Sequence, residues 1–229
     1  MRSILVALLF SFALLHANNL VPPKYTVSDV PKKMSVKTKK QRFYFLLVPA
    51  IDKVYTELDT QYKQIQKELH DNNATKNTAK IVALKKVYKV SSDEDLLRAL
   101  KPHPRSIAIA QAAIESAWGT SRFFTQANNV FGMWSANKND KRIAAGEKRG
   151  GTRTIWLRKF DSIEESVRAY YKTLSRGKTY KAFRTEKYKS DNVFLMVKKL
   201  DKYSERGEAY TQELASMIRY NKLTKYDQR

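Results

Sequence analysis

The stretch AIAQAAIESAWGTSRF, residues 108–123, places one carboxylate, Glu115, in an otherwise apolar run of small residues. A glutamate is rarely buried without a partner, so its presence there needs a reason. The apolar residues occupy most directions around a helix, which predicts a helix buried nearly all round. Gln111 and Glu115 lie four residues apart and form its substantial polar strip. Such a helix is typical of the floor of a cleft.

The position of Glu115 within this helix favours acid catalysis. We expect the helix to begin behind Pro102 and Pro104 and to end at Gly119 in a left-handed conformation. Glu115 then lies near the negative end of the helix dipole, and both this dipole and burial raise the pKa of its carboxyl group. A general acid needs such a pKa to hold its proton near neutral pH. Pairing with one of the 44 Lys and Arg residues is the alternative.

Several separated motifs resemble one family. QAAIESAWGTSRF followed by NNVFGMW is similar to the FlgJ-like glucosaminidase superfamily of peptidoglycan hydrolases, glycoside hydrolase family 73, with its Q-A-x-x-E-S-x-W-G…NN-x-F-G pattern. KTKKQRFYFLLVPAI, FDSIEESVRAYYKTL and YSERGEAYTQELASMI resemble its Bax-type branch. The resemblance spans about residues 37–221.

The resemblance implies an α+β, predominantly helical, lysozyme-like fold, in which a helical lobe and a small β-lobe flank a glycan cleft. Glu115 falls on the family's catalytic acid, Asn129, Phe131 and Gly132 on the motif that shapes the cleft floor, and Tyr203 on a tyrosine that faces the cleft. The implied activity is that of an exported endo-β-N-acetylglucosaminidase. A muramidase or lytic transglycosylase on the same fold, or a non-catalytic basic wall-binding protein, are the alternatives.

Glycosidases usually need a second carboxylate. Glu147, in the expected turn AAGEKRGGT, is the tentative candidate, although GEKR is also typical of a solvated turn. Asp140 is a weaker candidate for this second carboxylate. We expect Glu205 to pair with Arg206. Without a second carboxylate, the acetamido group of the substrate would act as nucleophile, positioned by Tyr203 or an Asn.

Aromatic and amide side chains complete the expected substrate site: Gln111, Asn129, Phe131, Trp134, Tyr203 and Tyr210. Trp156 lies in an expected strand, and its side chain could point to either face of that strand. Tyr203 and Tyr210 would share a face if one helix spanned both, which Gly207 argues against. Neither HExxH nor Cys/His spacing is present, so we expect no metal and no cofactor.

The rest of the chain predicts the elements that must position this site. We expect a signal peptide at 1–17, an extended basic arm at 18–35, a helical region at 36–101 and a lysozyme-like domain at 102–229 with its β-lobe at about 128–160. Pro49 should kink or break the first helical segment. Ser92 and Ser162 are expected N-caps, TRTIWLRKF a strand and GEKRGG a turn.

Composition narrows the setting of the protein. The formal net charge is +22 and there is no Cys, so disulfides and thiol chemistry are excluded. The apolar run from Ile4 to Leu15 predicts export, hence a periplasmic or secreted protein, with an uncleaved anchor as the alternative. The expected partners are the glycan strands of peptidoglycan, with peripheral contact to an anionic membrane or wall surface. Export argues against nucleic acid as the natural partner, and we expect a monomer.

Overall fold

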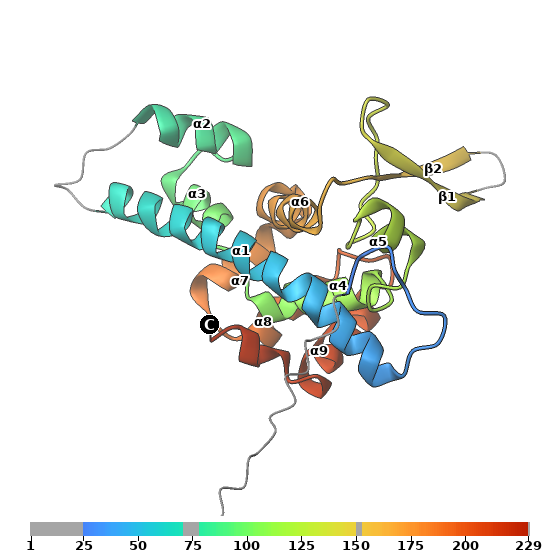
Figure 1. Ribbon diagram of the computed structural model, residues 1–229. Helices are drawn as coiled ribbons and strands as arrows, with labels where there is room; N and C mark the ends of the chain where they lie inside the picture. The colour runs from blue at the N-terminus through green and yellow to red at the C-terminus, as the bar shows by residue number, and fades with distance from the viewer. Residues whose placement is uncertain (1–24, 71–77, 150–152, 229) are drawn as a thin grey trace, which may run out of the picture.

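The computed structural model describes residues 25–70, 78–149 and 153–228, and within these ranges the protein is mostly helical (Figure 1). A two-stranded antiparallel sheet interrupts the helices. This confirms the α+β, predominantly helical architecture with a small β-lobe. In chain order the elements are α1 (Val36–His70), α2 (Thr78–Tyr88), α3 (Asp93–Leu100), α4 (Arg105–Glu115), α5 (Arg122–Ala127), β1 (Arg142–Arg149), β2 (Arg153–Arg158), α6 (Ile163–Arg176), η1 (Lys178–Tyr180), α7 (Lys181–Lys189), α8 (Val193–Lys198), α9 (Glu208–Tyr220) and η2 (Leu223–Tyr226).

Helix α1 runs unbroken through Pro49, and the expected break there is wrong (Figure 1). Proline in a helix interior removes one hydrogen bond and costs about 3 kcal/mol. The same apolar face continues on both sides of it, however, and Leu47, Val48, Ala50 and Ile51 are all buried. Packing of this face therefore outweighs the local cost.

Helix α4 lies at the centre of the fold and packs against α1, α9 and η2. Every residue from Arg105 to Ala113 is buried, which confirms the expected all-round burial. Alanines at 108, 110, 112 and 113 let the neighbouring helices approach closely. The carboxylate at the end of α4 is thereby held on a rigid element.

The buried apolar residues form two clusters that meet along α1. The larger cluster joins the first half of α1, from Phe43 to Val54, to α4, α6, α8 and α9. The smaller one joins the second half of α1 to α2 and α3. The first half of α1 thus belongs to the core that carries the acid.

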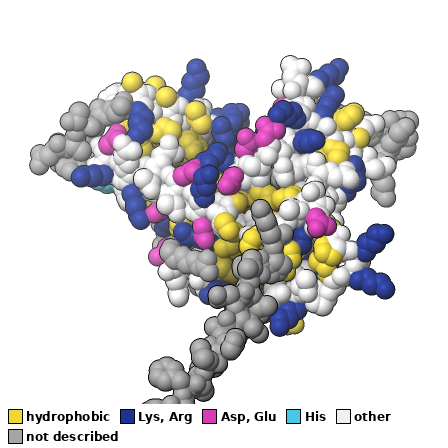
Figure 2. All heavy atoms as spheres, in the orientation of Figure 1, with side chains coloured by type: hydrophobic (Ala, Val, Ile, Leu, Met, Phe, Trp, Pro, Cys, Tyr) yellow, Lys and Arg dark blue, Asp and Glu magenta, His cyan; other side chains and the backbone are white. Residues whose placement is uncertain are grey.

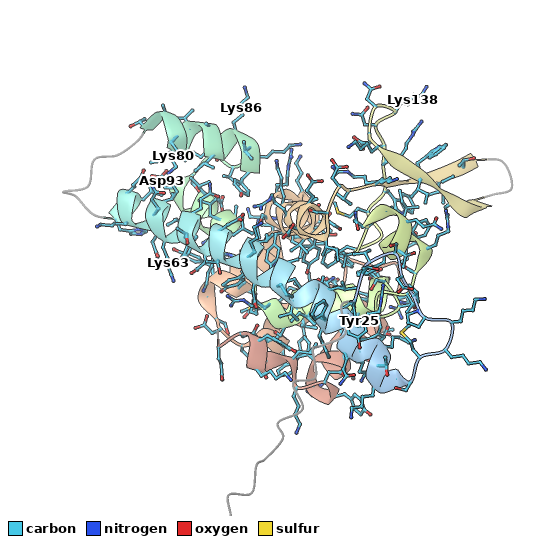
Figure 3. The ribbon with its side chains drawn as sticks, in the orientation of Figure 1. Tyr25, Lys63, Lys80, Lys86, Asp93 and Lys138 are labelled. Carbon is cyan, nitrogen blue, oxygen red and sulfur yellow. The ribbon has the colours of Figure 1, made fainter. Side chains whose placement is uncertain are left out.

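The β-lobe is a hairpin that projects from one side of the helices (Figure 1). Ile143 pairs with Leu157 and Ala144 with Trp156, and the register is irregular between Ala144 and Lys148. The expected strand at TRTIWLRKF is confirmed as β2. Residues 146–149 of the expected turn GEKRGG continue β1, and its last two residues lie outside the described part of the chain. Lys138 lies at the outer end of the loop that precedes β1 (Figure 3).

The first described residues pack on the fold, so this part of the expected arm is docked. The Tyr25 ring meets the Phe45 ring edge-on at 5.6 Å, over α1 (Figure 3). Val27 packs against the larger core cluster. The expected signal peptide and the first part of the arm lie outside the described residues. In the described part of the chain, no helix combines the length and the apolar character that a bilayer span requires.

Two predicted N-caps are confirmed. The side chains of Ser92 and Ser162 accept hydrogen bonds from the backbone N–H of Asp95 and Glu165, at 3.1 and 3.2 Å. Gly207, with φ of 57°, precedes α9.

Lys and Arg side chains are scattered over the visible face of the molecule (Figure 2). Their distribution therefore singles out no binding surface on that face.

Candidate active site

A cleft of about 940 Å³ opens between the β-lobe and the helices. The β-lobe side contributes Trp134 and Ile155, and the helical side contributes Thr173, Tyr180 and the segment before α9. Glu115 lies in the wall of this cleft. The lining residues are Glu115, Phe131, Gly132, Met133, Trp134, Ile155, Thr173, Tyr180, Tyr203, Ser204, Glu205 and Arg206.

Glu115 is the last residue of α4, and its carboxylate is half-buried. The Tyr210 hydroxyl donates a hydrogen bond to Glu115 Oε1 at 3.1 Å. Burial raises the pKa of the Glu115 carboxyl, while the Tyr210 bond and the charge of Arg206 lower that pKa and Glu213 raises it, with an upward net result. The Glu115 carboxyl is therefore suited to keep its proton to a higher pH than an exposed glutamate does.

The turn after Glu115 is left-handed at three successive residues. Ala117, Trp118 and Gly119 have φ of 51°, 60° and 72°, a conformation that costs residues other than glycine free energy. Ser116 holds this turn, because its Oγ donates to the Ala112 carbonyl and accepts from the Gly119 N–H. The predicted left-handed Gly119 is confirmed, whereas the conformations of Ala117 and Trp118 were not predicted.

Gln111 and Tyr210 lie behind the cleft wall and are fully buried. Gln111 Nε2 donates to the Tyr210 hydroxyl at 2.9 Å, and this hydroxyl donates onward to Glu115. Their polar atoms are thus engaged in hydrogen bonds within the protein, although both residues were expected to contact the substrate. Tyr203 lines the cleft and its ring stacks on that of Tyr210, at 5.5 Å between centroids and 16° between planes.

No single helix spans Tyr203 and Tyr210, because α9 begins at Glu208. The rings nevertheless share a face, since the turn between them brings them together. Burial raises the pKa of both phenols, so both hydroxyl groups keep their protons at neutral pH. Tyr210 is thus available as a hydrogen-bond donor to the acid.

Asn129 shapes the cleft floor from below. Its side-chain Nδ2 donates to the carbonyls of Met133 and Arg158, at 2.9 and 2.8 Å, and its Oδ1 accepts from the Met133 N–H at 2.8 Å. The side chain is 1% exposed, so it fastens the loop to β2 and does not reach the cleft. Asn129 was expected to contact the substrate, whereas its side chain is bonded to backbone groups of its own loop and of β2.

Phe131 and Gly132 form part of the cleft surface that this loop carries. The Phe131 ring is buried and stacks on Tyr170 at 3.8 Å, with 4° between the planes. Gly132 has φ of 62°, which the missing Cβ makes inexpensive. A tight turn of this kind lets the loop backbone itself face the cleft.

Two tryptophans extend the cleft over the β-lobe. Trp134 is 62% exposed and lines both the cleft and an adjoining hollow of about 480 Å³. Trp156 also lines this hollow, with Arg142 over its ring at 4.4 Å. The exposed ring of Trp134 is suited to stack on the apolar face of a sugar ring.

The other acidic candidates occupy different places. Glu147 lies in β1, and its side chain is outside the described part of the structure. Asp140 accepts a hydrogen bond from Ser135 Oγ at 3.0 Å, which favours a structural role. Arg206 pairs with Glu213 at 2.6 Å, and Glu205 lines the cleft with Glu115. The sequence predicted a local pair of Glu205 with Arg206 and did not predict that Glu205 lines the cleft.

Replacing Glu115 by Gln should stabilise the fold at neutral pH. The raised folded-state pKa means that protonated Glu115 favours folding, and this contribution is lost as the pH rises from the unfolded pKa through the folded one. Gln avoids that loss, so we expect a gain of about 1 kcal/mol, or about 2–4 °C, near pH 7. Thermal unfolding between pH 4 and 8 measures it. A gain that grows toward acid pH contradicts this reasoning, and exposed Glu94→Gln is the control.

The fold and the site define a mostly helical protein with a small β-lobe, whose cleft carries a half-buried glutamate that accepts a hydrogen bond from a tyrosine. Among the described residues, no group of three His, Asp or Glu side chains is arranged to hold a metal ion. The family model described as mannosyl-glycoprotein endo-beta-N-acetylglucosaminidase matches residues 94–223. The chain belongs to this glucosaminidase family.

Three known proteins to which this chain is similar share 20% to 28% identity with it. Protein bax of Escherichia coli strain K12 is 28% identical over 211 residues, which covers 86% of this chain and 74% of that protein. A peptidoglycan hydrolase from Sphingomonas sp. A1 is 23% identical with a TM-score of 0.45, over 56% of this chain and 86% of that one. The catalytic domain of the autolysin Auto from Listeria monocytogenes is 20% identical with a TM-score of 0.46, over 72% and 97%.

Proposed function

We propose that the protein is an exported endo-β-N-acetylglucosaminidase that cleaves the glycan strand of peptidoglycan, with Glu115 as the general acid. The observation that carries the proposal is the Glu115 carboxyl in the cleft wall, with a raised pKa and with Oε1 held by Tyr210. Membership of the glucosaminidase family supports the reaction class. Exposed Trp134 supports a carbohydrate ligand, since its ring offers a stacking face.

In this mechanism Glu115 protonates the glycosidic oxygen that leaves. Oε1 accepts the Tyr210 hydrogen bond, so Oε2 is the oxygen that carries the acid proton. Water or the acetamido oxygen of the substrate attacks from the opposite face of the sugar. Glu205 lines the same cleft and is our candidate for activating that water, beside the earlier candidate Glu147.

Digestion of purified sacculi tests the reaction. We expect native protein to release fragments with reducing N-acetylglucosamine ends, identified by mass spectrometry. Anhydromuramic ends would show that the activity is that of a lytic transglycosylase. Reducing muramic ends would show that it is that of a muramidase. Binding to sacculi without release would favour a non-catalytic wall-binding role.

The same digestion separates the candidates for the second carboxylate. If Glu205 activates water, Glu205→Gln lowers turnover about 10²-fold or more, while Glu147→Gln remains close to native. The reverse result would assign the role to Glu147. Near-native turnover of both variants would support attack by the acetamido group.

Replacing Tyr210 by Phe should move the alkaline limb of the pH–rate profile to higher pH. The Tyr210 bond lowers the pKa of Glu115, so its loss raises that pKa further. A general acid works when protonated, hence activity persists to higher pH. We also expect kcat to fall about tenfold, because the carboxyl loses its orientation. A limb that stays in place or moves to lower pH would contradict this role.

A further inference from the structure

Behind the cleft, a chain of hydrogen bonds leads from His103 to the proposed acid. His103 Nε2 lies 3.0 Å from the Tyr170 hydroxyl, which donates to Gln111 Oε1 at 2.6 Å. Gln111 Nε2 then donates to Tyr210 at 2.9 Å, and Tyr210 donates to Glu115 at 3.1 Å. The first four residues are all buried. The mechanism above uses only the last link.

The hydrogen bonds of this chain all run in one direction, each donor pointing toward Glu115. A tyrosine hydroxyl carries a single proton, and that of Tyr170 points to Gln111 Oε1. His103 Nε2 must therefore be the donor in its bond to Tyr170. Burial, together with the charge of Lys187, lowers the pKa of His103, which keeps the imidazole neutral. Its bond to Tyr170 then places the single ring proton on Nε2. Each link then hands a donor to the next, up to the carboxyl.

We propose that Tyr170 and His103 are positioning residues that act through Gln111 and Tyr210 on Glu115. They hold the chain in this direction, so that the Tyr210 proton points to Oε1 and the acid proton stays on Oε2. The inference rests on the proposed role of Glu115 as general acid. It extends that role to two buried residues that do not line the cleft.

The Gln111 amide is the pivot of this arrangement. Its oxygen and nitrogen are similar in size, so rotating the amide by half a turn would present Oε1 to Tyr210. Tyr210 would then donate to Gln111 and its bond to Glu115 would be lost. Tyr170 prevents this rotation because its hydroxyl needs an acceptor, and leaving a buried polar group unpaired costs about 1–3 kcal/mol.

Tyr170 is itself held on two sides. Its ring stacks on Phe131 at 3.8 Å, and its oxygen accepts the bond from His103. Replacing Tyr170 by Phe removes the hydroxyl and keeps the stacked ring. The substitution therefore removes only the hydrogen bonds that Tyr170 makes to His103 and Gln111. Gln111 is then free to rotate.

The charges around the two ends of the chain remain in place in that variant. Arg206, Glu213 and Tyr210, from α9 and the segment before it, interact with Glu115, and Tyr203 stacks on Tyr210. Lys187 of α7 acts on His103 at the other end. Since the substitution removes none of these groups, a change in the titration of Glu115 reports on the chain.

The adjacent Tyr171→Phe is a matched control for Tyr170→Phe. Tyr171 is equally buried, and its hydroxyl donates to the His103 carbonyl at 3.4 Å, outside the chain. We expect Tyr170→Phe to lower kcat on sacculi about tenfold and to move the alkaline limb to higher pH, whereas Tyr171→Phe changes neither. In the double variant Tyr170→Phe/Tyr210→Phe, the alkaline limb of the pH–rate profile should lie at the same pH as in Tyr210→Phe alone.

Direct titration of the Glu115 carboxyl by carbon-13 NMR gives a readout that needs no turnover. We expect the midpoint to rise in Tyr170→Phe and to stay at the native value in Tyr171→Phe. An unchanged midpoint in Tyr170→Phe, or equal rises in both variants, would overturn the inference. Failure of the native protein to cleave any glycan would instead refute the proposed function, and the titration would still decide the role of the chain.

Discussion

Glu115→Gln is expected to lower cleavage of peptidoglycan by about 10²–10⁴-fold, the contribution typical of a positioned general acid. Gln keeps the size of the side chain and an oxygen that can accept the bond from Tyr210, but it has no proton to give to the leaving oxygen. The measurement is the initial rate of fragment release from sacculi, with binding to sacculi measured in parallel. We expect the bound fraction to stay close to native.

Glu213→Gln is a suitable control for this loss. Glu213 is also a carboxylate near the site, pairs with Arg206 and raises the pKa of Glu115, but it does not line the cleft. We expect its turnover to remain within about an order of magnitude of native. Full activity of Glu115→Gln would remove Glu115 from the mechanism.

Arg42→Met is expected to lower the free energy of unfolding by about 3 kcal/mol or more. The Arg42 guanidinium is 0% exposed and donates to four backbone carbonyls. Three belong to the docked arm, those of Thr26, Val27 and Asp29, and the fourth is that of Gly119 at 2.8 Å. Methionine leaves these carbonyls without this donor.

The same substitution should reach the acid through the left-handed turn. Gly119 ends the turn that follows Glu115, so losing the Arg42 bond loosens a backbone whose conformation is costly for Ala117 and Trp118. Denaturant unfolding measures the loss of stability, and sacculus digestion measures the effect on rate.

Arg168→Met provides the comparison for Arg42→Met. Arg168 pairs with Glu57 on the surface, and such pairs contribute about 0–1 kcal/mol. An equal loss of stability in the two variants would show that the buried guanidinium does not clamp the arm to the turn.

Much of the local structure follows from residues close together in the chain. Ser92 and Ser162 cap their helices because a hydroxyl and the N–H groups it binds lie within three residues. The small apolar residues around Glu115 predicted the burial of α4 for a similar reason, since the 3.6-residue period places them on every side. Pro49 is the exception, because apolar packing along α1 outweighs its local cost.

The partners of the acid were less accessible to sequence reasoning. Tyr203 and Tyr210 were expected near the cleft, but their separate roles depend on which ring is buried. Asn129 was expected to contact substrate, yet burial turns its amide toward two carbonyls of its own loop and β2. The ion pair of Arg206 with Glu213, seven residues away, was not predicted.

The sequence by itself determined the burial of the helix that carries the acidic residue Glu115 and the family to which the motifs belong, because these depend on spacing within short segments. Only the tertiary structure decided what touches that acid. The bond from Tyr210 to Glu115 spans 95 positions, and the clamp from Arg42 to Gly119 spans 77. Such contacts exist only once α9 and α1 have packed on α4, since no local preference specifies them.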